Sequence, residues 1–104
     1  MSALTDLITR VEAATGPDIH LDAAIAAHFG QPQRIDYFTS SIDAVVALIR
    51  REMPGASYGF TREPPSAVFA RVTMAYGASG DADHITEALA LLLAFLRAKV
   101  QQDA

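Results

Sequence analysis

The chain has 104 residues, of which 51% are hydrophobic and 19% charged, and these values are typical of one globular domain spanning residues 1–104. Disulfides are excluded because the sequence contains no cysteine. Eight basic against twelve acidic residues give a net charge of -4, which excludes a general electrostatic attraction to nucleic acid or to an anionic membrane.

The sequence shows no pattern of a targeting or membrane-spanning segment. Residues 1–10 lack a basic region followed by an apolar core, so we expect no secretory signal. The longest apolar run, 88–96, is much shorter than the ~20 residues that a membrane span needs. We therefore expect a cytoplasmic protein that does not associate with membranes.

Two short helices are expected within the first 30 residues, because apolar residues recur there at intervals of three and four. Gly16-Pro17 ends the first helix, since proline lacks an amide donor and disfavours helical geometry in the preceding residue. Asp18 stands at the N-cap position of the second helix, which ends at Gly30. The apolar positions are Leu4, Leu7, Ile8 and Val11 in the first helix, and Leu21, Ala24, Ile25 and His28 or Phe29 in the second.

A third helix is expected over 42–53, after a loop at 31–38. Ser40 and Asp43 approximate a capping box at its start, with the shorter aspartate in place of glutamate. The basic pair Arg50-Arg51 suits the negative end of the helix dipole.

Residues 57–62 and 67–76 are rich in aromatic and β-branched residues and predict a β-hairpin, because the prolines of 63–66 cannot continue a ladder. If these prolines form the turn centre, Phe60 lies opposite Phe69, whereas a one-residue slip or a bulge reverses the faces of the first strand. Both registers remain open. Alternation in the second strand places on its core side Val68, Ala70, Val72, Met74 and Tyr76.

The last helix is expected to follow a flexible break at 77–80, with Asp81 or Asp83 as its cap. It is apolar around most of its girth, which is typical of a helix central to a fold or buried in a subunit interface. Leu91 and Phe95 extend beyond the main apolar stripe and are the candidate residues of an oligomer interface. Two strands alone are marginal, so helices should cover the sheet and a second copy can extend it by dimerisation.

The sequence contains no constellation that points to catalysis, so we expect no enzyme, no cofactor and no metal. The histidines His20, His28 and His84 lack a metal-ligand spacing with Asp22 or Asp83. Helix capping is a sufficient role for the hydroxyls at 40–41, and the glycine-bearing segment 76–80 lacks the lysine of a phosphate loop. No pair of carboxylates stands out for acid–base chemistry.

One group of side chains is a candidate binding surface. Guanidinium groups together with an aromatic ring suit planar anionic ligands or the centres of protein interfaces. The alternative is a solvated sheet face, on which arginine is common. The candidate ligand-binding residues are Arg34, Tyr58, Arg62 and Arg71.

Three segments, at 4–26, 38–44 and 88–98, resemble the phage ABA-sandwich domain family. The first contains Gly16-Pro17, the second is the block Phe-Thr-Ser-Ser-Ile-Asp-Ala that opens a helix, and the third is the alanine- and leucine-rich last helix. The resemblance implies an α+β fold in which a sheet lies between helices, in a small protein of phages or prophages, and it implies no activity. The family often carries tryptophan in the strand region, where this chain has Tyr58 and Phe60.

Together these observations predict an α+β fold, a helix–sheet–helix sandwich of four helices and a β-hairpin. The function expected is that of a non-enzymatic phage or prophage accessory protein that acts by binding, with a protein of the bacterial host as its partner. One alternative is a protein that binds or sequesters a small anionic, nucleotide-like ligand through Tyr58, Arg62 and Arg71. The other is a structural subunit that forms a homodimer or a larger homo-oligomer.

Overall fold

The structure is a computed structural model that describes residues 3–30, 36–62, 68–74 and 77–103. This part of the chain is α+β, with four helices and one antiparallel sheet of strand order β1-β2-β3. The elements are α1 (Ala3–Ala13), α2 (Ile19–His28), α3 (Ile42–Glu52), β1 (Ser57–Arg62), β2 (Val68–Thr73), β3 (Ser79–His84) and α4 (Glu87–Asp103).

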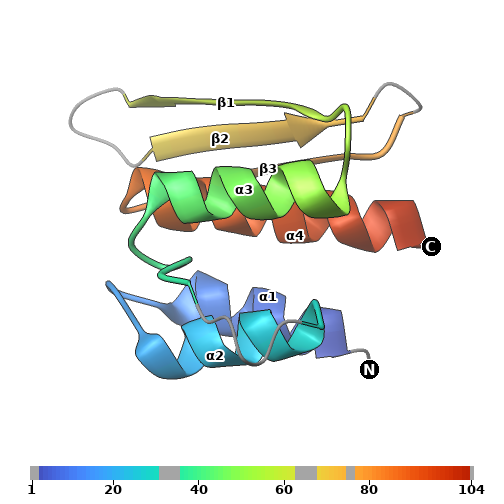
Figure 1. Cartoon of the computed structure of the whole chain (residues 1–104). Helices are drawn as coiled ribbons and strands as arrows, with labels where there is room; N and C mark the ends of the chain where they lie inside the picture. The colour runs from blue at the N-terminus through green and yellow to red at the C-terminus, as the bar shows by residue number, and fades with distance from the viewer. Residues whose placement is uncertain (1–2, 31–35, 63–67, 75–76, 104) are drawn as a thin grey trace.

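The elements form layers, with the sheet on one side of the molecule and the helices on the other (Figure 1). Helix α4 packs on the sheet, α3 lies beside α4, and α1 and α2 lie beneath these two helices (Figure 1). Among the described residues no helix covers the opposite face of the sheet, so the order is sheet, helices, helices. A helix–sheet–helix sandwich, which the resemblance implied, is therefore not the arrangement of the described part of the chain.

Helix α4 is the centre of the core, because β2 and β3 pack on one side of it and α1 and α3 on others. Every residue from Ala88 to Leu96 is at most 3% exposed. This includes Leu91 and Phe95, both fully buried within one chain, and the Phe95 ring contacts that of Phe29 with centroids 5.5 Å apart. Burial within a single chain thus explains why α4 has apolar residues on most of its faces. No helix among the described residues combines the length and hydropathy that a membrane crossing requires.

The third strand corrects the expectation of a flexible break and of a last helix that begins at Asp81 or Asp83. Residues Ser79–His84 form β3 instead, and α4 begins at Glu87. Ala82 and His84 are buried whereas Asp81 and Asp83 are exposed, which is the alternation of a strand. The sequence pattern does not indicate β3 as a strand, because its helix-facing residues are small or polar and have weak strand propensity.

Close packing between β3 and α4 explains these small residues. A Cβ atom at Gly80 would overlap the backbone of Ala94 and Ala98, and would lie 2.9 Å from Cβ of Arg97. Ala94 and Ala98 are themselves fully buried and one helical turn apart. Gly80 is therefore required by the approach of the helix to the strand.

Of the two remaining predicted helix caps, one is confirmed and the other is shifted by one residue. The Asp18 carboxylate accepts hydrogen bonds from the N–H groups of His20 and Leu21, at 3.0 and 3.1 Å. Helix α3 is capped by Ser41, whose hydroxyl accepts from Ala44 N–H at 3.3 Å, and not by Ser40.

Two registers of β1 and β2 were left open by the sequence. The structure has the one that is shifted by one residue from the pairing of Phe60 with Phe69. Phe60 lies opposite Ala70 and Tyr58 opposite Val72, while Thr61 lies opposite Phe69. Because directly opposite residues share a face, Tyr58 and Phe60 are on the helix side of the sheet.

Candidate functional site

The face of the sheet that points away from the helices, called the outer face, is uncovered by any described element. Its central side chains are Phe69 and Arg71 of β2, opposite Asp83 and Asp81 of β3. Phe69 is 37% exposed, which is high for an aromatic residue in the central strand of a sheet. The outer face therefore presents an apolar ring among charges.

Arg71 is held by its neighbours on the outer face. Its Nη2 lies 3.5 Å from Oδ2 of Asp81, and its guanidinium carbon is 5.7 Å from the centroid of the Phe69 ring. Both partners of the ion pair are more than half exposed, so the pair adds little stability. The arrangement keeps the guanidinium group against the aromatic ring, a combination common at the centres of protein interfaces.

The free side of β1, called the β1 edge, presents two more aromatic residues. Tyr58 is 37% exposed and Phe60 is 40% exposed, although both lie on the helix side of the sheet. Nη2 of Arg50, in α3, donates to the Tyr58 hydroxyl at 3.4 Å. No carboxylate pairs with Arg50 among the residues that the structure describes.

The two predicted ligand-binding residues whose side chains the structure describes, Tyr58 and Arg71, do not share a site. Tyr58 and Arg71 lie on opposite faces of the sheet, because Tyr58 pairs with Val72 and Arg71 pairs with Gly59. Arg34 lies outside the described residues, and of Arg62 only the backbone, at the end of β1, is described.

A buried polar cluster joins the start of α2 to the segment before α3. Thr39 N–H donates to Oδ1 of Asp22 at 2.8 Å, and Asp18 N–H donates to the Thr39 hydroxyl at 2.8 Å. Asp22 and Thr39 are each 1% exposed. Burial raises the pKa of the Asp22 carboxyl, an effect that the hydrogen bonds from Thr39 oppose and the nearby Asp18 charge reinforces. Its role is structural, since each polar group serves the chain's own backbone.

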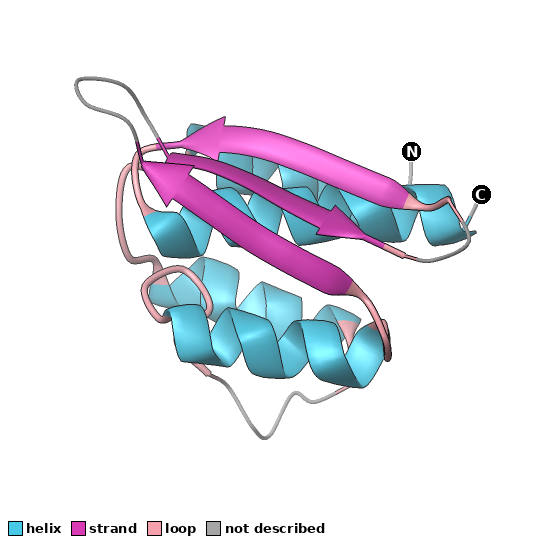
Figure 2. Cartoon of the chain, turned by 90° about the horizontal axis from the view of Figure 1, so that it is seen from above, coloured by secondary structure: helices cyan, strands magenta, loops and turns pink. Residues whose placement is uncertain are grey.

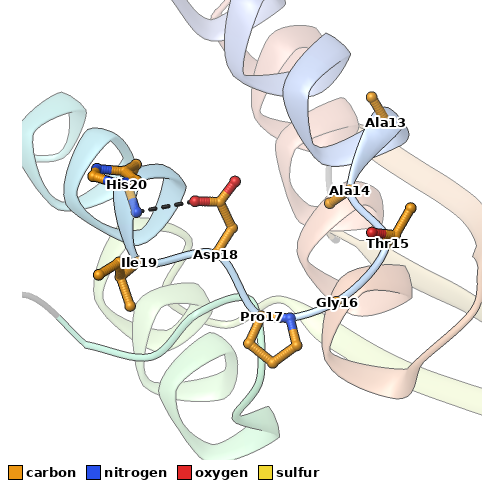
Figure 3. Close-up of a pocket in the computed structure, with 8 residues that line it drawn as sticks. All are labelled: Ala13, Ala14, Thr15, Gly16, Pro17, Asp18, Ile19 and His20. Atoms are coloured by element: carbon orange, nitrogen blue, oxygen red, sulfur yellow. Dashed lines mark hydrogen bonds between the residues drawn. The ribbon is translucent and has the colours of Figure 1, made fainter.

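A cavity of about 470 Å³ lies at the turn between α1 and α2 and is lined by residues 13–20 (Figure 3). The Asp18 carboxylate points into this space, but it already accepts the N–H groups that cap α2. A second cavity of about 470 Å³ lies between α1 and α2, with Asp6, Arg10 and His28 among its lining residues. Neither cavity has a buried polar group aimed at a ligand among the described residues.

The histidines have structural or surface positions. His20 and His28 are exposed, whereas His84 is 8% exposed and both of its ring nitrogens have partners. Nδ1 accepts from Ile85 N–H at 2.8 Å, so Nε2 carries the proton and donates to the Val11 carbonyl at 2.8 Å. Within the described ranges, no three potential metal ligands lie together.

Two side-chain contacts at the edges of the sheet were not predicted from the sequence. One is the contact of Arg50 with Tyr58, because the basic pair at the end of α3 is explained equally well by the helix dipole. The other is the covering of the β3 edge by Arg97 and Gln101 of α4, which lie one turn apart on one helix face. The covering of the β3 edge could have been predicted if residues 79–84 had been recognised as a strand.

Comparisons with known proteins assign the chain to no family, because it matches no family model, no curated protein and no solved structure. The resemblance to the phage ABA-sandwich domain family therefore stays a prediction from the sequence.

Proposed function

We propose that this protein acts by binding another protein, without catalysis, through the outer face and the β1 edge. The sequence resemblance further leads us to propose a phage or prophage accessory role in the bacterial cytoplasm, with a host protein as the partner. The observation that carries the binding proposal is the placement of every described helix on one side of the sheet (Figure 1). This placement leaves Phe69 of the central strand partly exposed on the outer face, and Tyr58 and Phe60 are partly exposed at the β1 edge.

The chemistry of the surface suits a protein partner. Exposed aromatic residues gain free energy when a partner removes them from water, and aromatic and arginine side chains dominate the energy of many interfaces. Phe69 and Arg71 provide such a pair on the outer face, and Asp81 and Asp83 provide a charged rim beside it. A charged rim contributes specificity and association rate more than affinity.

A small anionic ligand is less well supported by the geometry. The two described members of the predicted ligand site, Tyr58 and Arg71, are on opposite faces of the sheet. In addition, Arg71 contacts Asp81, whose carboxylate would repel an anion at this position.

The proposal can be tested by capture of proteins from a bacterial lysate with the immobilised chain. The variants are Phe69→Ser and Phe60→Thr, compared with Val100→Thr, because Val100 in α4 is also 37% exposed but lies away from the sheet surface. We expect a defined protein to bind the wild type and the Val100 variant, and to be depleted at least tenfold with the two sheet variants. Equal capture by all four chains, or a partner lost only with Val100→Thr, would contradict the proposal.

A further inference from the structure

The two edges of the sheet differ in how their backbone groups are covered. At β3, Ser79 N–H donates to Oε1 of Gln101 at 3.0 Å, and the Asp81 carbonyl accepts from Nη1 of Arg97 at 2.8 Å. Both covering side chains belong to α4, so these two backbone groups already have partners and are not available to another strand. At the β1 edge, no side chain of the described residues bonds to the backbone of Tyr58 or of Phe60.

The hydrogen-bond pattern of the sheet shows which groups of β1 point outward. In an antiparallel ladder, successive residues direct their N–H and C=O groups to alternate sides. Met74 N–H donates to the Ala78 carbonyl at 2.7 Å, so the even-numbered residues of β2 bond toward β3 and the odd-numbered ones toward β1. By register, the residues of β1 that bond to β2 are Ser57, Gly59 and Thr61, and those whose backbone groups point away from the sheet are Tyr58 and Phe60.

Most of β1 lacks the features that discourage pairing with a further strand. Edge strands are usually protected by proline, lysine, inward-pointing charges or bulges. Residues 57–61 contain neither proline nor a charged side chain, and the one charged residue of β1 is Arg62 at its end. The pairing of β1 with β2 is continuous without a bulge. Together with the uncovered Tyr58 and Phe60 backbone, this makes the β1 edge a template for strand addition.

Helix α3 lies beyond this edge. It packs against α4, and in the view from above it extends past β1 on the side away from β2 (Figure 2). An added strand would therefore lie over α3 and next to Arg50, which reaches the Tyr58 hydroxyl and has no carboxylate partner among the described residues. The site offers backbone pairing, two aromatic rings and one available positive charge.

The position of α3 also favours a single extended segment over a second copy of the chain. In a two-fold dimer whose β1 strands pair antiparallel, the helices of both copies lie on the same face of the joined sheet. Each α3 would then extend beneath the other copy's sheet, where α4 already packs (Figure 2). A single segment brings no helix into that space.

We propose that the β1 edge binds an extended segment of a partner protein as a fourth strand, and that a carboxylate of this segment pairs with Arg50. This inference rests on the proposed function and specifies the chemistry of the partner. Alternate side chains of the segment lie against Tyr58 and Phe60, so apolar residues are expected at every second position. The acidic residue is expected at the end of the segment near the start of β1, where the Arg50–Tyr58 contact lies.

The probe is a library of random nonapeptides displayed on yeast and selected against the full chain. We expect the selected peptides to share alternating apolar residues and one Asp or Glu. In hydrogen exchange, a selected synthetic peptide should slow the amides of Tyr58 and Phe60 at least tenfold, while those of Gly59 and Thr61 are slow already. These protected positions distinguish strand addition from binding elsewhere.

A charge exchange tests the role of Arg50. Arg50→Glu should weaken binding of the acidic peptide at least tenfold, and a peptide with Lys in place of the acid should recover affinity for this variant. The matched control is Arg51→Glu, which changes the same charge at a neighbouring residue that pairs with Glu52 at 3.2 Å. Equal effects of the two variants, or selected peptides without an acidic preference, would overturn the carboxylate assignment.

Three further outcomes show whether this inference, the proposed function or both are wrong. If the lysate partner depends on Phe69 but not on Arg50, and its binding leaves Tyr58 and Phe60 amides unprotected, the proposed function stands and the fourth strand is wrong. If these amides become protected with rising protein concentration and no peptide, the β1 edge binds a second copy and the inference is overturned. If neither Phe69 nor Arg50 matters to any partner, both fail.

Discussion

His84 at the end of β3 and Val11 in α1 are 73 residues apart in the chain and are joined by a hydrogen bond of 2.8 Å between the imidazole Nε2 and the Val11 carbonyl. The same ring accepts Ile85 N–H through Nδ1 at 2.8 Å. One buried side chain thus links the sheet to α1, which lies beyond α4 (Figure 1). The contact fixes the relative position of two layers that are distant in sequence.

Replacing His84 by leucine should destabilise the fold. The change removes both hydrogen bonds and leaves Ile85 N–H without its acceptor, a cost of about 1–3 kcal/mol in the free energy of unfolding. The matched control is His20→Leu, because His20 is exposed and should change stability by less than about 0.5 kcal/mol. Urea denaturation of the two variants measures the difference, and equal midpoints would show that the link is not needed.

Gly80→Ala should also destabilise, for a steric reason. The added methyl group would overlap the backbone of Ala94 and Ala98, and neither backbone can move without shifting α4 from the sheet. We expect a loss of about 1–3 kcal/mol, as for overpacking in a core. Gly59→Ala in β1 is the control, since its Cβ would meet no atom within 4 Å, and it should be neutral or slightly stabilising. Thermal unfolding of both variants measures the difference, and equal midpoints would contradict the steric explanation.

The contrast between β2 and β3 shows how much of the fold can be predicted from the sequence. The buried residues Val68 and Val72 alternate with exposed ones, so β2 follows from hydrophobic period alone. In β3 the corresponding inward positions are Gly80 and Ala82, which are small and buried, and at Gly80 α4 approaches too closely for any side chain. The strand is specified by its neighbour and not by its own propensity.

Only part of the candidate surface could be predicted, because the rest also depends on contacts with neighbouring elements. Tyr58 and Arg71 could be identified as exposed strand residues, but whether Tyr58 shares the face of Arg71 depends on a register that one residue of slip reverses. The importance of Arg50 depends on where α3 lies relative to β1, which is set by the packing of α3 on α4. Positions that depend on tertiary contacts of this kind have no signature in a single sequence.

Asp22 should make stability depend on pH. Burial raises its pKa in the folded state above the ordinary value of 3.8, so the folded form binds the proton more tightly than the unfolded form does. This contribution is fully present below pH 3.8 and is lost as the pH rises through the raised pKa. In Asp22→Asn the amide oxygen can still accept Thr39 N–H, and this source of pH dependence is removed. Unfolding free energies of both proteins should show the stability of the wild type relative to the variant falling from acid to neutral pH, and a constant difference would contradict the assignment.

The double variant Arg97→Ala, Gln101→Ala should open the β3 edge. It leaves Ser79 N–H and the Asp81 carbonyl without their partners and removes the 2.8 Å ion pair of Arg97 with Glu12. The ion pair is partly exposed, so the loss of stability should stay near about 1 kcal/mol. The larger effect should be self-association, because an edge strand with free backbone groups pairs readily with another chain.

Light scattering over a range of protein concentrations measures this association. The control is Arg51→Ala, Gln102→Ala, which removes the same residue types, with Arg51 at 38% side-chain exposure against 39% for Arg97. We expect the edge variant to associate at concentrations where the control and the wild type remain unchanged. Equal association of the two double variants would mean that these side chains do not protect β3, and the difference between the two sheet edges would then lose its explanation.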